Sequence, residues 1–110
     1  MRVPNADNAV VDIRKLRDYC LNPHHEIGKH KARVFAVALN LTYQDAEVLR
    51  AALLEAVKTI EAEIGKFDEY GQRYTVDFEI ERQGKIAVVR SGWIIDAHSE
   101  MPRLVTCLIL

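Results

Sequence analysis

The residues best suited to chemistry lie in one short run, Asn22–Arg33, which holds three of the chain's four histidines. Lys29, Lys31 and Arg33 share that run, at the expected start of a helix. The positive end of a helix dipole disfavours cations there, so the cluster adds little to stability. Cationic side chains beside free backbone N–H groups do, however, bind anions well. The run therefore predicts a phosphate or other anion site at a helix N-terminus.

These residue types match the chemistry of metal-independent ribonucleases. Such an enzyme needs a base for the 2′-hydroxyl, an acid for the leaving oxygen and cations on the phosphate. Histidine titrates near neutral pH, so His25 and His30 are the candidate acid and base. We expect Lys31 and Arg90 to stabilise charge in the transition state. The candidates for holding phosphate or substrate are Lys29, Asp77, Ser91, Trp93 and Arg103.

The clustered histidines do not predict a metal site. Their spacing, HHxxxxH, lacks the i and i+4 pair that places two ligands on one helix face. No cysteine or aspartate joins them, although Glu26 lies nearby. Cys20 and Cys107 are far apart and have no CxxC partner, so we expect two buried thiols rather than a zinc module or a disulfide framework. We therefore predict no metal and no cofactor.

Apolar spacing predicts helices first and strands after them. The expected helices cover 13–21, 29–39 and about 42–64, and the expected strands cover 74–81, 86–95 and 104–110. Asp12 and Thr42 are the expected N-caps, and Gly65 is the expected C-cap of the third helix. The chain is thus predicted to be α+β, with three N-terminal helices packed on one face of a C-terminal antiparallel sheet of three or more strands.

The turn Gln83–Gly84 sets the register of the expected hairpin. With these two turn residues, Asp77 faces Arg90 and Tyr74 faces Trp93. Opposed residues share a face, so an apolar face packs on the helices while Asp77 and Arg90 lie on the other. Arg90 interrupts an apolar run and needs a partner or an anion, and a structural ion pair with Asp77 is the simplest interpretation. Trp93 is expected in the core, with base stacking as the alternative.

Length and composition limit the function classes. The chain has 110 residues and a formal net charge of −1, which predicts one domain over residues 1–110. The near-neutral total argues against a general nucleic-acid coat protein but allows an enzyme that grips one or two phosphates. A signal-peptide pattern and an apolar stretch of about 18 residues are both missing, so we expect a cytoplasmic protein without a membrane segment.

Several segments resemble a bacterial family catalogued only as a domain of unknown function. The strongest is Asn22–Phe35, and the others lie at 4–7, 9–12, 15–19, 70–74, 89–95 and 102–106. The resemblance implies a domain that stands alone, notably in cyanobacteria, or forms the C-terminal tail of phage-type and secreted proteins, a position typical of toxin modules. The layout is also similar to the barnase/colicin/RelE-like ribonuclease toxins, which is an analogy of fold. The family pattern varies at His30, which favours Lys31, His25 and Arg90.

The sequence leaves two functions open. The first is a toxin-like endoribonuclease that holds RNA between the basic helix start and the polar sheet face. The second is a non-catalytic interaction module, either a homodimer or the partner of a protein from a neighbouring gene. In that case the Arg90–Asp77 pair is structural, and the basic run binds an acidic partner or is simply solvated. Lys31→Ala and Arg90→Ala separate the two, because only the first function predicts loss of activity with the fold intact.

Overall fold

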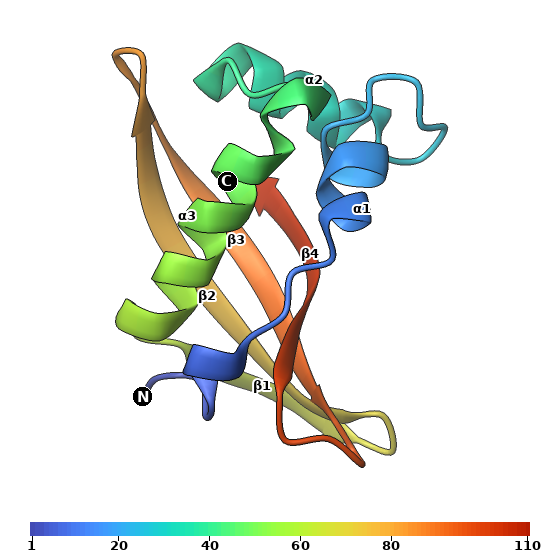
Figure 1. The fold of residues 1–110 in the computed structure, drawn as a ribbon, viewed down its shortest axis with the longest axis vertical. Helices are drawn as coiled ribbons and strands as arrows, with labels where there is room; N and C mark the ends of the chain where they lie inside the picture. The colour runs from blue at the N-terminus through green and yellow to red at the C-terminus, as the bar shows by residue number, and fades with distance from the viewer.

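Helices and strands form two layers in the computed structural model, which describes residues 1–110. Figure 1 shows α3 lying across one face of a twisted sheet, with α1 and α2 towards one end of it. The helices are α1 (Ile13–Lys15), α2 (Lys29–Leu39) and α3 (Ala46–Thr59). The strands are β1 (Glu63–Asp68), β2 (Gly71–Arg82), β3 (Lys85–Asp96) and β4 (Pro102–Ile109). The α+β prediction is confirmed, although the helices occupy the N-terminal and middle parts of the chain.

The four strands are antiparallel neighbours in the order β1-β2-β3-β4. The predicted hairpin register is confirmed: Asp77 pairs with Arg90, and Tyr74 pairs with Trp93. The turn residues Gln83 and Gly84 have φ angles of 52° and 80°, as a two-residue type I′ turn requires. The shared register places the apolar side chains of β2 and β3 under the helices.

The third helix ends earlier than predicted. It stops at Thr59, because Ile60 is extended with ψ 142° and the backbone N–H of Ala62 donates to the carbonyl of Met1. Gly65 is not a C-cap but lies in β1, which the sequence did not indicate. The side chains of β1 are almost all exposed, so this strand carries no alternation of apolar and polar residues.

The first helix is also shorter than predicted. Asp12 is its N-cap as expected and accepts a hydrogen bond from the backbone N–H of Arg14 at 3.0 Å. The chain then widens into a π-helical turn over Leu16–Cys20, in which the N–H of Leu21 donates to the carbonyl of Leu16 at 2.8 Å. A π-turn rotates the following residues relative to an α-helix. Here it keeps Leu16, Cys20 and Leu21 buried together.

The third helix also begins later than predicted, at Ala46, because the cap at Thr42 opens a 3₁₀ turn over Tyr43–Asp45 that precedes it. Helix α2 has the predicted bounds. Thr42 and Asp45 form a capping box, in which the Thr42 N–H donates to the Asp45 carboxylate at 2.9 Å. These hydrogen bonds from Thr42 lower the pKa of Asp45, and the nearby Arg82 adds to the effect. None of the helices has the length and apolar run that crossing a bilayer requires.

The core lies between the helices and the inner sheet face. It contains 21 buried residues, of which Phe35, Leu49 and Leu53 come from the helices and Val76 and Trp93 from the sheet. The N-terminal segment also contributes Val3 and Val11, and between them Val10 forms an isolated parallel bridge with β4. Its N–H donates to the carbonyl of Pro102 at 2.9 Å, and its carbonyl accepts from Leu104 at 3.0 Å. This bridge covers the start of the β4 edge and leaves the rest of that edge open.

Candidate functional site

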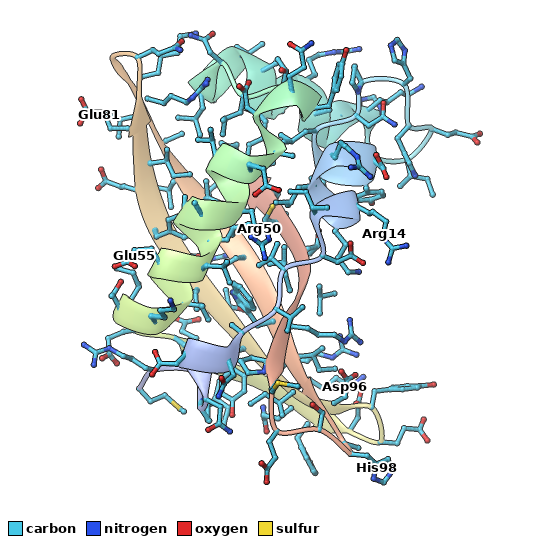
Figure 2. The ribbon with its side chains drawn as sticks, in the orientation of Figure 1. Arg14, Arg50, Glu55, Glu81, Asp96 and His98 are labelled. Carbon is cyan, nitrogen blue, oxygen red and sulfur yellow. The ribbon has the colours of Figure 1, made fainter.

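A pocket of about 640 Å³ opens at the uncovered part of the β4 edge. Four side chains from three segments meet there: Tyr19 from the π-turn, His25 and Lys31 around the start of α2, and Thr106 from β4. The other lining residues are Asp12, Arg14, Lys15, Asp18 and Val105. Figure 2 shows Arg14 projecting outward from α1 on this side of the molecule. We call this site the β4-edge pocket.

Lys31 is the central cation of the β4-edge pocket. Its Nζ donates to Thr106 Oγ1 at 2.9 Å and lies 5.3 Å from the centre of the Tyr19 ring. The ring face attracts the ammonium and helps to hold it in place. Lys31 forms no ion pair, unlike the eight cationic groups of the chain that do. Its charge is therefore available to an anion.

His25 has a fixed orientation beside that cation. Its Nδ1 accepts hydrogen bonds from the backbone N–H groups of Ile27 at 3.1 Å and Gly28 at 2.9 Å. A nitrogen that accepts carries no proton, so the neutral ring is assigned its proton on Nε2. The ring meets Tyr19 edge to face, with 4.7 Å between the ring centres. His25 can thus donate a hydrogen bond from Nε2.

The same contacts occupy part of the helix N-terminus at which an anion site was predicted, and that site stays a prediction. Besides the bonds to Nδ1, the N–H of Lys29 donates to the carbonyl of His25 at 2.9 Å. The N–H groups of Ile27, Gly28 and Lys29 are therefore already bonded within the chain. The N–H groups of His30 and Lys31 have no backbone acceptor, so an anion at this end of α2 can still be met by them as well as by the Lys31 side chain.

Gly28 brings the pocket's segments together. A Cβ atom at this position would lie 2.4 Å from the carbonyl oxygen of Tyr19, which is closer than real contacts allow. The start of α2 can therefore approach the π-turn only because residue 28 has no side chain. This close approach places Tyr19 against both His25 and Lys31.

The carboxylates at the rim are bound to arginines. Asp12 accepts two hydrogen bonds from the Arg14 guanidinium, at 3.0 Å and 2.7 Å, which with the backbone bond from Arg14 lower its pKa to about 2. The Arg17 guanidinium bonds Asp18 in the same bidentate way and lowers the pKa of that carboxyl. Both groups are ionised and weakly basic at neutral pH. Lys15 completes the rim as a second cation outside any ion pair.

The two cysteines lie directly behind the β4-edge pocket. Both are buried, as predicted, and the Cys20 thiol lies 3.7 Å from the carbonyl oxygen of Cys107. The hydrogen bond from the Cys107 thiol lowers the pKa of Cys20, and the charge of Lys31 acts in the same direction, against the effect of burial. The Cys20 thiol and burial together raise the pKa of Cys107. Cys20 directly follows Tyr19 and Cys107 directly follows Thr106, so the contact between the cysteines joins the two segments that carry these pocket residues.

Arg90 lies beside the β4-edge pocket but does not line it. Its guanidinium binds Asp77 through two hydrogen bonds, at 2.9 Å and 2.8 Å, and holds the pKa of Asp77 below its usual value. Arg90 is two positions from Gly92, which faces Thr106, so Arg90 and Thr106 share a sheet face about 7 Å apart along the strand. Gly92 places no side chain between them. Lys31 therefore lines the β4-edge pocket, whereas Arg90 lies on the adjacent part of the sheet outside it.

Ser91 and Trp93 belong to the core, as expected for Trp93, and their burial corrects the alternative in which they contact substrate. Both are buried, with exposed fractions of 0% and 1%. The Trp93 Nε1–H donates to Ser91 Oγ at 2.9 Å, and Ser91 Oγ donates to the carbonyl of Val76 at 2.7 Å. The register already places both residues on the inner face. Their polar atoms are bonded to each other and to the backbone, so neither can reach a ligand.

Three further expected residues lie outside the β4-edge pocket. Lys29 and His30 are exposed and do not line it. Arg103 binds the Asp96 carboxylate at 2.7 Å and 3.0 Å. Figure 2 shows Asp96 near His98, at the end of the molecule away from α1 and α2. No three side chains of His, Cys, Asp or Glu assemble into a metal-binding group anywhere in the structure.

The comparison with protein families agrees with the resemblance seen in the sequence. The model of the family described as Domain of unknown function (DUF6883) matches residues 2–110. The chain belongs to this family. A search of curated proteins finds no match to it.

The search of solved structures finds chains with a similar fold, among them a chain of a toxin–immunity complex. It is described as "Contact-dependent growth inhibition toxin - immunity protein complex from Klebsiella pneumoniae 342". The matching chain has a TM-score of 0.69 and 17% identity, and the match covers 92% of the DUF6883 chain and 99% of the other. At this level of identity the likeness concerns the fold.

The DUF6883 pocket contains residues that the sequence reasoning did not single out. Tyr19 and Thr106 contact Lys31, and Lys15 adds the second free cation. A signal for two of them was present, because two of the segments that carry the family resemblance, 15–19 and 102–106, end on Tyr19 and Thr106. Neither residue type suggests catalysis alone, and only the fold brings the two segments to one opening.

Proposed function

We propose that this DUF6883 chain is a toxin-like, metal-independent endoribonuclease with its phosphate site in the β4-edge pocket. The observation that supports this most is the convergence of Lys31, His25, Tyr19 and Thr106 on one opening, with Lys31 in no ion pair. The free polar groups of these side chains are hydrogen-bond donors, and the two rim carboxylates are occupied by arginines. Such a donor set suits a phosphate oxygen better than a metal ion.

The proposed reaction is an internal transfer on the RNA backbone. The 2′-oxygen forms a bond to phosphorus, and the bond from phosphorus to the 5′-oxygen breaks. The products are a 2′,3′-cyclic phosphate and a 5′-hydroxyl end. Lys31 stabilises the extra negative charge on the five-coordinate phosphorus, which is the step where a fixed cation contributes most. His25 donates from Nε2 to a phosphate oxygen, and Thr106 positions the Lys31 ammonium.

The β4-edge pocket supplies charge rather than a strong base. Nδ1 of His25 is occupied by two backbone N–H groups, and Asp12 and Asp18 are held by arginines that lower their pKa. The proposal therefore assigns removal of the 2′-hydroxyl proton to hydroxide from solvent. Protonation of the leaving 5′-oxygen comes from water. The acceleration then rests on binding and electrostatic stabilisation.

Cleavage of RNA by the purified chain tests this function. Total RNA is incubated with the protein in excess EDTA, and the new ends are identified by their reactivity towards kinase and phosphatase. We expect cleavage in EDTA, with 2′,3′-cyclic phosphate and 5′-hydroxyl ends. Intact RNA at high protein concentration, together with normal growth of cells that express the chain, would contradict the proposal.

The structural neighbour supports a second candidate function, that of a non-catalytic protein partner. Its description names a complex of a toxin with an immunity protein, and a chain of this fold could serve as a non-catalytic partner in such a pair. That function predicts no cleavage product and a stable complex with the product of a neighbouring gene. Co-expression with that gene and co-purification measure it. Cleavage by the isolated chain, without any partner, decides for the ribonuclease.

A further inference from the structure

The opposite edge of the sheet carries an apolar groove that the proposed ribonuclease site does not use. The groove has a volume of about 720 Å³ and lies between α3 and β2. Its apolar lining comes from Ala52 and Ala56 on α3, from Ile60 just after it, and from Phe78, Ile80 and Val88 on the sheet. We call it the β2-edge groove.

The groove runs beside backbone that has no strand partner. Strand β1 pairs with β2 only between Gly71 and Thr75, so residues 76–82 have a partner on the β3 side alone. None of the backbone hydrogen bonds outside the regular elements reaches this stretch. Figure 1 shows β1 beside only the lower part of β2, while the upper part is free along its outer side. An exposed strand edge of this kind offers N–H and C=O groups to an added strand.

The walls of the groove are acidic. Glu55 on α3 and Glu79 on β2 line it, are exposed and form no ion pair. Asp77 also lines the groove but is bonded to Arg90. Glu81 continues the row of acids along β2, and Figure 2 shows it near the tip of the hairpin. The groove thus has an apolar floor, a negative rim and free backbone groups.

We propose that the β2-edge groove binds an extended, basic segment of a partner protein, which adds to β2 as a further strand. The backbone of the segment bonds to the free edge, as in strand addition to other sheets. Because alternate side chains of a strand point to opposite sides, every second residue can enter the apolar groove. Lysine or arginine between them meets Glu79 on the outer face of the sheet, while Glu55 borders the apolar groove from α3.

The acidic row argues against a second copy of this chain as the occupant. Antiparallel pairing of two β2 edges would bring the rows that contain Asp77, Glu79 and Glu81 together. Like charges opposite each other on neighbouring strands are destabilising. Charge on an edge strand is a common device against self-association, and here it leaves a basic partner as the favoured occupant.

Peptides of fixed pattern test the proposal. The probe is a labelled eight-residue peptide of alternating lysine and valine with blocked ends, and its counterpart replaces each lysine with glutamate. We expect the lysine peptide to bind, as measured by fluorescence anisotropy, and to slow amide hydrogen exchange in residues 76–82. Glu55→Lys combined with Glu79→Lys should weaken this binding about tenfold or more. The matched control is Glu69→Lys, an exposed acid in the β1–β2 turn, which should change it little.

Several results would overturn the proposal. They are equal binding of the lysine and glutamate peptides, unchanged exchange in residues 76–82, or the same loss in Glu69→Lys as in the double variant. A dimer that forms without peptide and protects residues 76–82 would assign the groove to a second copy instead. RNA cleavage is measured on the same variants and should not change, so failure of this proposal is distinguishable from failure of the ribonuclease function.

Discussion

The two edges of the sheet differ in charge and in the polar groups that lack a partner within the chain. At the β4 edge, free cations and hydrogen-bond donors surround a polar pocket, with Lys31 bonded to Thr106. At the β2 edge, free carboxylates surround an apolar groove beside an unpaired backbone. The total charge of −1 hides this division. One small sheet thus presents two surfaces suited to opposite partners, an anion at one edge and a basic segment at the other.

The largest effect is expected from Lys31→Ala. Removal of one group that stabilises transition-state charge typically costs a factor of about 100 to 1,000 in rate. We expect a loss of that size in single-turnover RNA cleavage, with peptide binding at the β2-edge groove unchanged. Lys29→Ala is the matched control, because Lys29 is a cation two residues away that lies outside the pocket. Equal losses in the two variants would show that general positive charge, rather than the pocket, supports cleavage.

The dependence of cleavage on pH should show which group removes the 2′-hydroxyl proton. If solvent hydroxide is the base, the single-turnover rate rises about tenfold for each pH unit between roughly pH 6 and 8. A bell-shaped profile would instead assign acid–base catalysis to a side chain of the pocket. If the profile is bell-shaped, the His25→Ala variant shows whether His25 is responsible. Loss of the bell shape in that variant would assign the catalysis to His25 rather than to the rim carboxylates.

Gly28→Ala should damage one edge and spare the other. The added Cβ would lie 2.4 Å from the Tyr19 carbonyl oxygen, so α2 and the π-turn must move apart. Overpacking of this kind costs about 1–3 kcal/mol of unfolding free energy. We expect that loss in urea denaturation, together with slower RNA cleavage in the protein that remains folded. Ala36→Gly in α2 is the control, because it weakens the helix without a clash and so tests whether a less stable helix alone slows cleavage.

The smallest effect is expected from Arg90→Ala. Arg90 and Asp77 are 48% and 36% exposed, so their pair is a surface ion pair rather than a buried one. Such pairs add little to stability, and the melting temperature should fall by a few degrees at most. The Arg90 guanidinium lowers the pKa of Asp77, so the pair stabilises above the ordinary pKa of aspartate and the benefit is lost as pH falls through the lowered value. Melting curves of the two proteins should therefore converge at low pH.

Local rules predicted the elements whose evidence is local. The capping role of Thr42, the bounds of α2 and the Asp77–Arg90 register all follow from short-range patterns, and the structure confirms them. Strand β1 was missed because its exposed side chains have no periodic pattern. The π-turn was missed because it depends on burial of residues that only the folded core brings together.

The candidate site was predictable in part for the same reason. Lys31 and His25 stand in a conspicuous run, and the structure brings them together. Tyr19 and Thr106 join them through long-range contacts that the pattern of the sequence does not contain. Those contacts are the close approach at Gly28, the Val10 bridge to β4, and the irregular register between Gly92 and Trp93. Ser91 and Trp93 were assigned to substrate although their own register places them inside.

Under the proposed function, RNA occupies the β4 edge and leaves the β2 edge free. Amide chemical shifts of the labelled protein, titrated with a short RNA whose 2′-hydroxyls are methylated, measure this directly because such RNA binds without being cleaved. We predict shift changes at Gly28, Lys31 and Thr106, with Ala52, Ala56 and Glu79 unmoved. Changes confined to the β2-edge groove, or no saturable change at either edge, would contradict the claim.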